Sequence, residues 1–97
     1  MKITDKQQEE LFYYMERELK KLEQVFKKIK IKEKRHQDTL KLALCYFKDA
    51  KHFYSKKEYV KCFELLNYVW GLLDSMAIGN AISVPKPLQK WFKHDFR

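Results

Sequence analysis

Glycine and proline are scarce in this sequence, with two of each among 97 residues, and none of the four precedes Gly71. Folds made of strands and tight turns need frequent turn residues, so the first seventy residues favour long helices joined by polar turns. A hydrophobic content of 45% and an aromatic content of 15% exclude the composition of a disordered chain. The length suits one domain. We therefore predict a small all-α protein.

Long apolar runs and cysteine clusters are also missing. The longest uncharged stretches, Leu65 to Leu73 and Ser75 to Pro85, are far shorter than the roughly 20 residues that span a bilayer. The first residues contain no apolar signal core. Cys45 and Cys62 form no motif, whereas a small secreted domain held by disulfides carries more cysteines. We expect a cytoplasmic protein with no membrane association.

Catalytic motifs are absent as well: there is no nucleophile-elbow pattern, no glycine-rich phosphate loop and no paired histidine–carboxylate motif. Cys45, Asp49 and His52 share one face of the second predicted helix, and their side chains are of the types that bind zinc. This set has no fourth ligand, and Lys41 and Lys48 crowd the same face. We therefore expect no catalytic residue, no metal, no cofactor and no small-molecule substrate.

Three apolar stripes at helical spacing predict three helices, over residues 5–30, 38–55 and 58–78. Thr4 or Asp5 followed by Gln7 or Gln8 resembles a capping box for the first helix. Asp38 is expected to cap the second helix. The spacing of Ser55 and Glu58 suggests a further capping box, and Gly79–Asn80 is a plausible stop for the third helix.

Short connections between these helices predict an up-down-up three-helix bundle with a long first helix over residues 1–80. A basic, aromatic and Pro-containing C-terminal tail follows over 81–97. The helical pattern predicts four almost fully buried core residues: Phe47, Phe63, Leu66 and Leu73.

The first predicted helix is longer than the other two, so part of its apolar stripe needs another cover. We expect the tail to cover the end of this helix, near Val25, Phe26 and Ile29, with Leu88, Trp91 and Phe92. The start of the helix is then left for a protein partner or a second copy. The predicted interface residues are Leu11, Phe12 and Met15.

Positive charge dominates, with 21 basic residues against 13 acidic residues and a net charge of +8. Eight of the basic residues lie between Lys20 and His36. The excess is compatible with a polyanionic partner, nucleic acid first; the alternative is an ordinary lysine-rich solvated surface. The candidate nucleic-acid contacts are Lys20, Lys21, Lys27, Lys28, Lys34, Arg35, Lys90, Trp91 and Lys93.

Gly71 lies inside the third predicted helix, where glycine costs about 1 kcal/mol relative to alanine. Asn67, Gly71 and Asp74 form one stripe at the edge of the apolar face. One interpretation is a shallow polar notch for a ligand or partner. The other is that Gly71 lets a second helix of the chain pack closely, while Asn67 and Asp74 bind helix ends or loop amides.

Residues of the second and third predicted helices also carry a family resemblance. The pattern consists of Tyr46, Asp49–Ala50, Phe53, Phe63, Tyr68, Gly71 and Leu73–Asp74. It resembles the core pattern of an archaeal family catalogued as domain of unknown function 357, over about Leu40 to Gly79. The resemblance implies a compact helical bundle and an archaeal source, and it implies no activity.

Two functional interpretations therefore compete. The first is a non-catalytic helical interaction or assembly module with a protein partner or a second copy, and the second is an RNA- or DNA-associated basic helical protein. A third, an enzyme or metal protein, rests on Cys45, Asp49 and His52 alone. Nucleic-acid binding weakens steeply with salt through counterion release, whereas an apolar interface persists.

Overall fold

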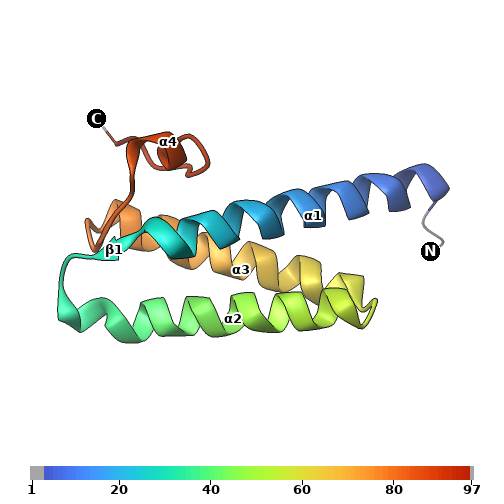
Figure 1. The fold of residues 1–97 in the computed structure, drawn as a ribbon, viewed down its shortest axis with the longest axis horizontal. Helices are drawn as coiled ribbons and strands as arrows, with labels where there is room; N and C mark the ends of the chain where they lie inside the picture. Colours follow the sequence, from blue (N-terminus) through green and yellow to red (C-terminus); the bar gives the residue numbers. More distant parts are fainter. Residues whose placement is uncertain (1–3, 97) are drawn as a thin grey trace.

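The computed structural model describes residues 4–96, and its main elements are helices, as predicted. In Figure 1 the three long helices lie side by side, with α2 running opposite to α1 and α3. The elements in chain order are α1 (Asp5–Lys28), β1 (Lys30–Ile31), η1 (Lys34–His36), α2 (Gln37–Ser55), α3 (Tyr59–Ile78), β2 (Ile82–Ser83) and α4 (Lys86–Gln89). None of the described helices is long and apolar enough to cross a membrane.

The start of α1 is closed by the predicted capping box. The hydroxyl of Thr4 accepts a hydrogen bond from the amide of Gln7 at 3.1 Å, and the side chain of Gln7 accepts one from the amide of Thr4 at 2.9 Å. The two bonds satisfy two donors that a helix start would otherwise leave free. The cap expected at Asp38 is wrong, because α2 begins at Gln37 and Asp38 lies in its first turn.

The turn between α2 and α3 differs from the prediction. Ser55 still belongs to α2, and its hydroxyl donates to the carbonyl of His52 at 2.6 Å, so it cannot cap α3. Lys57 reverses the chain instead with a φ of 62°. The predicted stop at the end of α3 is confirmed: Gly79 ends the helix and Asn80 takes a φ of 58°, which asparagine tolerates well.

The core lies where the three long helices meet. The predictions for Phe47, Leu66 and Leu73 are confirmed, with exposures of 1% or less. The prediction for Phe63 is wrong, because its side chain is 38% exposed. Cys62, not Phe63, occupies the buried position at that level of α3, and the ring of Phe63 packs at the edge, 5.4 Å from the ring of Tyr14 on α1.

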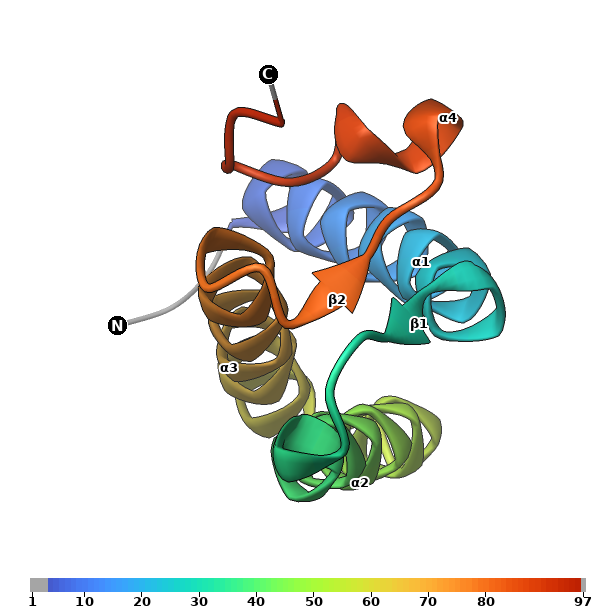
Figure 2. The same cartoon turned by 90° about the vertical axis from the view of Figure 1, so that its left-hand side faces the viewer.

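The described part of the C-terminal tail belongs to the same core. β2 pairs antiparallel with β1, with Ile82 opposite Ile31, and this pairing ties the tail to the end of α1 (Figure 2). Leu88 and Phe92 are 5% and 7% exposed and join the cluster that includes Val25 and Ile29. The tail therefore contributes to the cover of α1 that the length argument predicted.

The start of α1 projects beyond the turn between α2 and α3 (Figure 1). The first residues of α1, Asp5 to Glu10, are exposed and are all polar or charged, so they need no apolar cover. The predicted bare stripe is wrong at Met15, which is 0% exposed. Leu11 and Phe12 are half-buried, and the ring of Phe12 lies 4.5 Å from that of Tyr59. The start of α3 thus reaches far enough to cover this part of α1.

Candidate functional site

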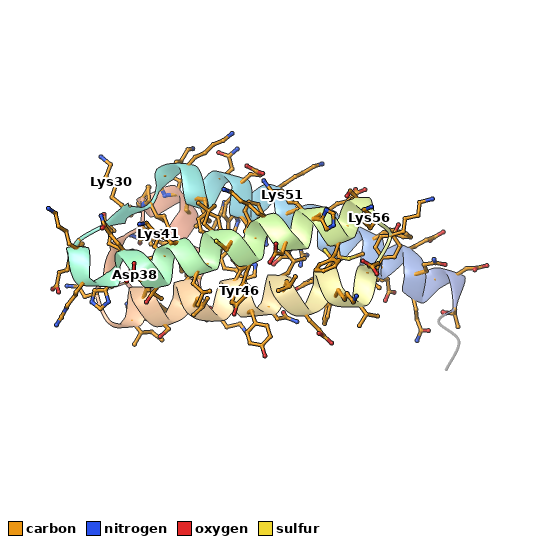
Figure 3. The ribbon with its side chains drawn as sticks, turned by 90° about the horizontal axis from the view of Figure 1, so that it is seen from below. Lys30, Asp38, Lys41, Tyr46, Lys51 and Lys56 are labelled. Atoms are coloured by element: carbon orange, nitrogen blue, oxygen red, sulfur yellow. The ribbon has the colours of Figure 1, made fainter. Side chains whose placement is uncertain are left out.

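Helix α3 is rich in apolar residues, and its neighbours leave one side of it exposed although that side also carries large apolar side chains. Among the described residues, six large hydrophobic side chains are exposed, and four of them lie on α3: Val60, Phe63, Tyr68 and Ile78. A helix that is hydrophobic all round is expected to be buried all round. By contrast, α2 carries charged residues away from the core, among them Lys41 and Lys51 (Figure 3).

We call the exposed side of this helix the outer α3 face. Its members are Val60, Lys61, Glu64, Asn67, Tyr68, Gly71, Leu72, Ser75 and Ile78. In its middle, a shallow hollow of about 640 Å³ is lined by Glu64, Asn67, Tyr68, Gly71 and Leu72. The face has two charged members, Glu64 and Lys61, and Lys61 is paired with Glu58 at 3.5 Å.

Within the described chain, the fold does not require glycine at position 71. A Cβ added at this position would meet nothing within 4 Å, so the interpretation that Gly71 allows a helix of the same chain to pack closely is wrong. Neither glycine has a positive φ, so the backbone does not require glycine here either. What the glycine does provide is access to the backbone of α3 from outside, at the floor of the hollow.

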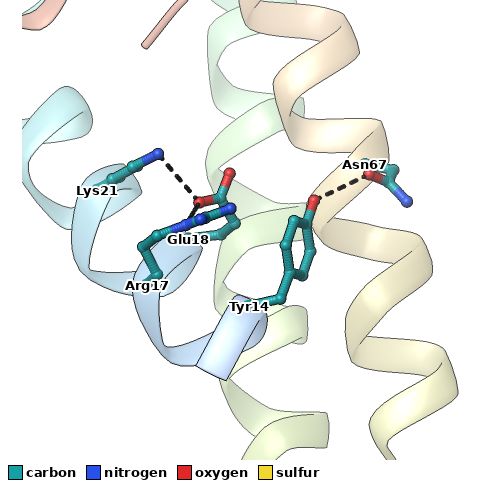
Figure 4. Close-up of polar contacts among 5 residues, drawn as sticks. All are labelled: Tyr14, Arg17, Glu18, Lys21 and Asn67. Carbon is teal, nitrogen blue, oxygen red and sulfur yellow. Dashed lines mark hydrogen bonds and ion pairs between the residues drawn. The ribbon is translucent and has the colours of Figure 1, made fainter. Parts of the chain in front are cut away.

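The structure divides the predicted polar notch between two roles. Asn67 lines the hollow together with Gly71, and its side-chain oxygen accepts a hydrogen bond from the hydroxyl of Tyr14 at 3.4 Å (Figure 4). Asp74 instead accepts a hydrogen bond from the amide of Lys93 at 3.0 Å. Asp74 therefore anchors the tail to α3, as the loop-amide interpretation proposed.

A buried carboxylate that the sequence analysis missed lies next to this anchor. Glu18 is 7% exposed, and its carboxylate lies 2.9 Å from Nε of Arg17 and 3.3 Å from Nζ of Lys21 (Figure 4). The hydrogen bond that Arg17 donates to Glu18 raises the pKa of Arg17, and burial is the main cause that raises the pKa of Tyr14. The sequence contained one signal of this buried carboxylate, because Glu18 is a charged residue on the apolar stripe between Met15 and Leu22.

A small polar cavity of about 120 Å³ separates α1, α3 and the tail at this point. Its lining residues are Tyr14, Glu18, Asn67, Trp70, Asp74, Trp91 and Lys93. Among the described side chains, the indole nitrogen of Trp70 is buried without an acceptor. A cavity of this polarity is suited to ordered water.

The structure brings together three of the nine candidate nucleic-acid contacts. Lys20, Lys21 and Trp91 line one open groove of about 510 Å³ between α1 and the tail. Lys27 and Lys28 lie in the last turn of α1. The remaining candidates lie in two further places: Lys34 and Arg35 in η1, and Lys90 and Lys93 on either side of Trp91 and Phe92 in the tail. The nine residues therefore do not form one continuous site, whereas the groove does form a defined one.

The zinc-like set does not form a site in the part of the chain that the structure covers. Cys45 is exposed, and the ring of His52 packs against that of Phe53 with centroids 5.6 Å apart. Within residues 4–96, no three histidine, cysteine or acidic side chains gather where they could hold a metal ion.

The family model for the protein of unknown function DUF357 matches residues 12–82. This match covers most of the chain and extends the resemblance at Leu40 to Gly79 to include α1 from Phe12 onward. The chain belongs to the DUF357 family. The segment that matches DUF357 contains the outer α3 face and ends within β2, so Trp91 lies outside it. Searches of curated proteins and of solved structures found no match.

Proposed function

We propose that this DUF357 protein is a non-catalytic helical assembly module that pairs with a second copy of itself through the outer α3 face. The observation that carries the proposal is Gly71, an exposed glycine in the middle of an apolar helix face, with no intrachain need for glycine. Exposed apolar patches on small proteins usually mark interaction sites.

Charge favours a second copy as the partner. Two molecules that each carry +8 repel one another wherever their lysine-rich surfaces meet. The outer α3 face carries one basic residue, Lys61, which is paired with Glu58 at 3.5 Å, so two copies meeting there bring little positive charge together. A closed pair with two-fold symmetry uses the same face on both molecules, and it is the commonest oligomer of soluble proteins.

The shape of the face supports close helix pairing. Gly71 and Ser75 are four residues apart, so their small side chains follow each other along one side of α3. Small residues at this spacing let two helix backbones approach closely. Val60 and Ile78, which are 64% and 66% exposed, lie towards the two ends of the helix and provide apolar contacts there. The proposal keeps the predicted self-association and moves its surface from α1 to α3.

The test is sedimentation over a series of concentrations with a matched pair of variants. Tyr68 on the outer α3 face and Tyr13 on α1 are 64% and 68% exposed, so Tyr68→Asp and Tyr13→Asp make the same change at equally accessible positions. We expect the wild type and Tyr13→Asp to dimerise as concentration rises and Tyr68→Asp to stay monomeric. A wild type that stays monomeric at the highest concentration, or equal loss of dimer in both variants, would contradict the proposal.

A further inference from the structure

The open groove beside Trp91 is a second surface, separate from the outer α3 face. Arg17, Lys20, Lys21, Glu23 and Gln24 of α1 form one side of this groove, and Trp91 of the tail forms the other. Its volume of about 510 Å³ falls within the range of small-ligand sites, roughly 300–1,000 Å³. We call it the Trp91 groove.

The indole of Trp91 is held in place on a fixed backbone. The next residue, Phe92, is buried and packs edge-on against Trp70 with ring centroids 5.6 Å apart. The residue after that, Lys93, donates its amide to Asp74. Nζ of Lys21 lies 5.8 Å from the centroid of the indole ring, within the range of a cation–π contact. Trp91 itself stays half-buried, so part of its ring is accessible from the groove.

Glu23, which lines the groove, and Glu18, which pairs with two of its lining residues, already have partners. The carboxylate of Glu18 lies between Arg17 and Lys21, and the carboxylate of Glu23 lies 2.8 Å from Nζ of Lys51. Within residues 4–96, Lys20 forms no ion pair, so its charge is available to a ligand. Lys27, seven residues further along α1, continues the positive surface on the same side of the helix.

We propose that the Trp91 groove binds one nucleotide, with its adjacent phosphates, of a single-stranded nucleic acid. The exposed part of the indole stacks on an unpaired base, and Lys20 and its basic neighbours contact the adjacent phosphates. This combination of an aromatic platform and a cationic rim is the general device for binding single strands. A duplex keeps its bases stacked inside the helix and presents no base face to Trp91.

Fluorescence provides a direct measurement once Trp70 is replaced. Trp70→Phe loses no hydrogen bond to the described chain, because the indole nitrogen has no acceptor there, and it leaves Trp91 as the remaining tryptophan. Titration with a single-stranded oligonucleotide is expected to quench Trp91, since stacking places a base against the ring. Absence of quenching at saturation, with binding established by anisotropy of a labelled oligonucleotide, would overturn the stacking contact and with it the proposal.

Affinity measurements in the otherwise wild-type chain test the charges. We expect Lys20→Gln and Trp91→Ala each to weaken binding roughly tenfold and Trp91→Phe to retain most of the affinity. Lys48→Gln on α2 removes the same charge from another exposed lysine without an ion pair, and we expect it to change little. If Trp91→Ala does not fold, the affinities of Lys20→Gln and Lys48→Gln are compared to decide whether the groove is the site. Equal losses in those two variants would overturn the groove as the site.

Affinities for four ligands, measured at constant salt concentration, show which form of nucleic acid the groove binds. The four are single-stranded RNA, single-stranded DNA, a duplex of the same sequence and a mononucleotide. Tighter binding of either single strand than of the duplex supports the proposal. The single strand that binds more tightly shows whether ribose or deoxyribose is preferred. Equal affinity for the duplex would overturn it. Equal affinity for the mononucleotide would overturn the polymer as the ligand.

Discussion

At the scale of single residues, Gly71 offers the simplest separation of folding from function. Its φ is not positive and its Cβ position is empty, so alanine fits the folded chain without a clash. Alanine is also the better helix former, because it restricts the unfolded chain more than glycine does. Glycine at this position lowers the stability of the monomer, and the fold of the monomer does not require it. We therefore expect Gly71 to form a contact with another molecule.

We therefore expect Gly71→Ala to raise the free energy of unfolding of the monomer by about 0.5–1 kcal/mol. The measurement is denaturant unfolding in the Tyr68→Asp background, where self-association does not contribute. In the wild-type background, the same substitution should weaken the dimer, because the added methyl keeps the two backbones apart. A stabilised monomer with an unchanged dimer would show that Gly71 is not at the centre of the interface.

Phe63 and Glu18 show how a single side chain can depart from its pattern. Phe63 lies next to Cys62 in sequence and about 100° away around α3, at the margin of the buried face. Glu18 lies on the buried face of α1 and is accommodated because Arg17 and Lys21 neutralise its carboxylate. The position of the neighbouring helices left Phe63 partly exposed, whereas ion pairs within α1 allowed Glu18 to be buried.

At the scale of elements, α1 and α2 are joined by a hydrogen bond that depends on pH. The hydroxyl of Tyr54 on α2 donates to the carboxylate of Glu16 on α1 at 2.9 Å. Burial, followed by this hydrogen bond, raises the pKa of Tyr54 from 10.0 to about 12. Burial alone raises the pKa of Cys62 on α3 from 9.0 to about 11. Both groups are therefore held in their neutral forms in the folded chain.

The raised pKa values predict the direction of alkaline unfolding. The folded chain keeps these protons at pH values where the unfolded chain has lost them, so the stabilisation is complete below about pH 9. We expect the free energy of unfolding to fall as the pH rises through about 11 and 12. Tyr54→Phe should flatten the upper part of this fall, measured by denaturant unfolding at a series of pH values. An unchanged profile in that variant would show that Tyr54 does not contribute.

At the scale of the whole molecule, the two proposed surfaces respond to salt in opposite directions. Salt screens the repulsion between two chains that each carry +8, so the dimer should become tighter as the salt concentration rises. Salt also competes with Lys20 and its neighbours for phosphate, so oligonucleotide binding should weaken. Sedimentation and anisotropy over the same salt series measure the two effects. A dimer that dissociates with added salt would indicate an electrostatic interface in place of the outer α3 face.

The two surfaces also differ in their relation to the family. The outer α3 face lies within the segment that matches DUF357, whereas Trp91 follows that segment. Self-association through α3 is thus a proposal that other DUF357 proteins can test, and the Trp91 groove is a proposal about this chain. Removing Trp91 should therefore leave the dimer intact.

The sequence by itself determined the three helices and most of their ends. The capping box at Thr4, the stop at Gly79–Asn80 and the buried positions of Phe47, Leu66 and Leu73 were all predictable. Their physical basis is local: caps involve residues within one turn, and an apolar stripe follows from the 3.6-residue period.

Tertiary structure alone decided where the two proposed surfaces lie. The pairing of β1 with β2, the contact between Phe12 and Tyr59 and the approach of Trp91 to Lys21 join residues that are distant in sequence. Such contacts depend on helix lengths, turn geometry and rotation about each helix axis, which no short pattern records. The covered stripe on α1 and the uncovered face around Gly71 have the same physical reason: both depend on where the neighbouring helices come to lie.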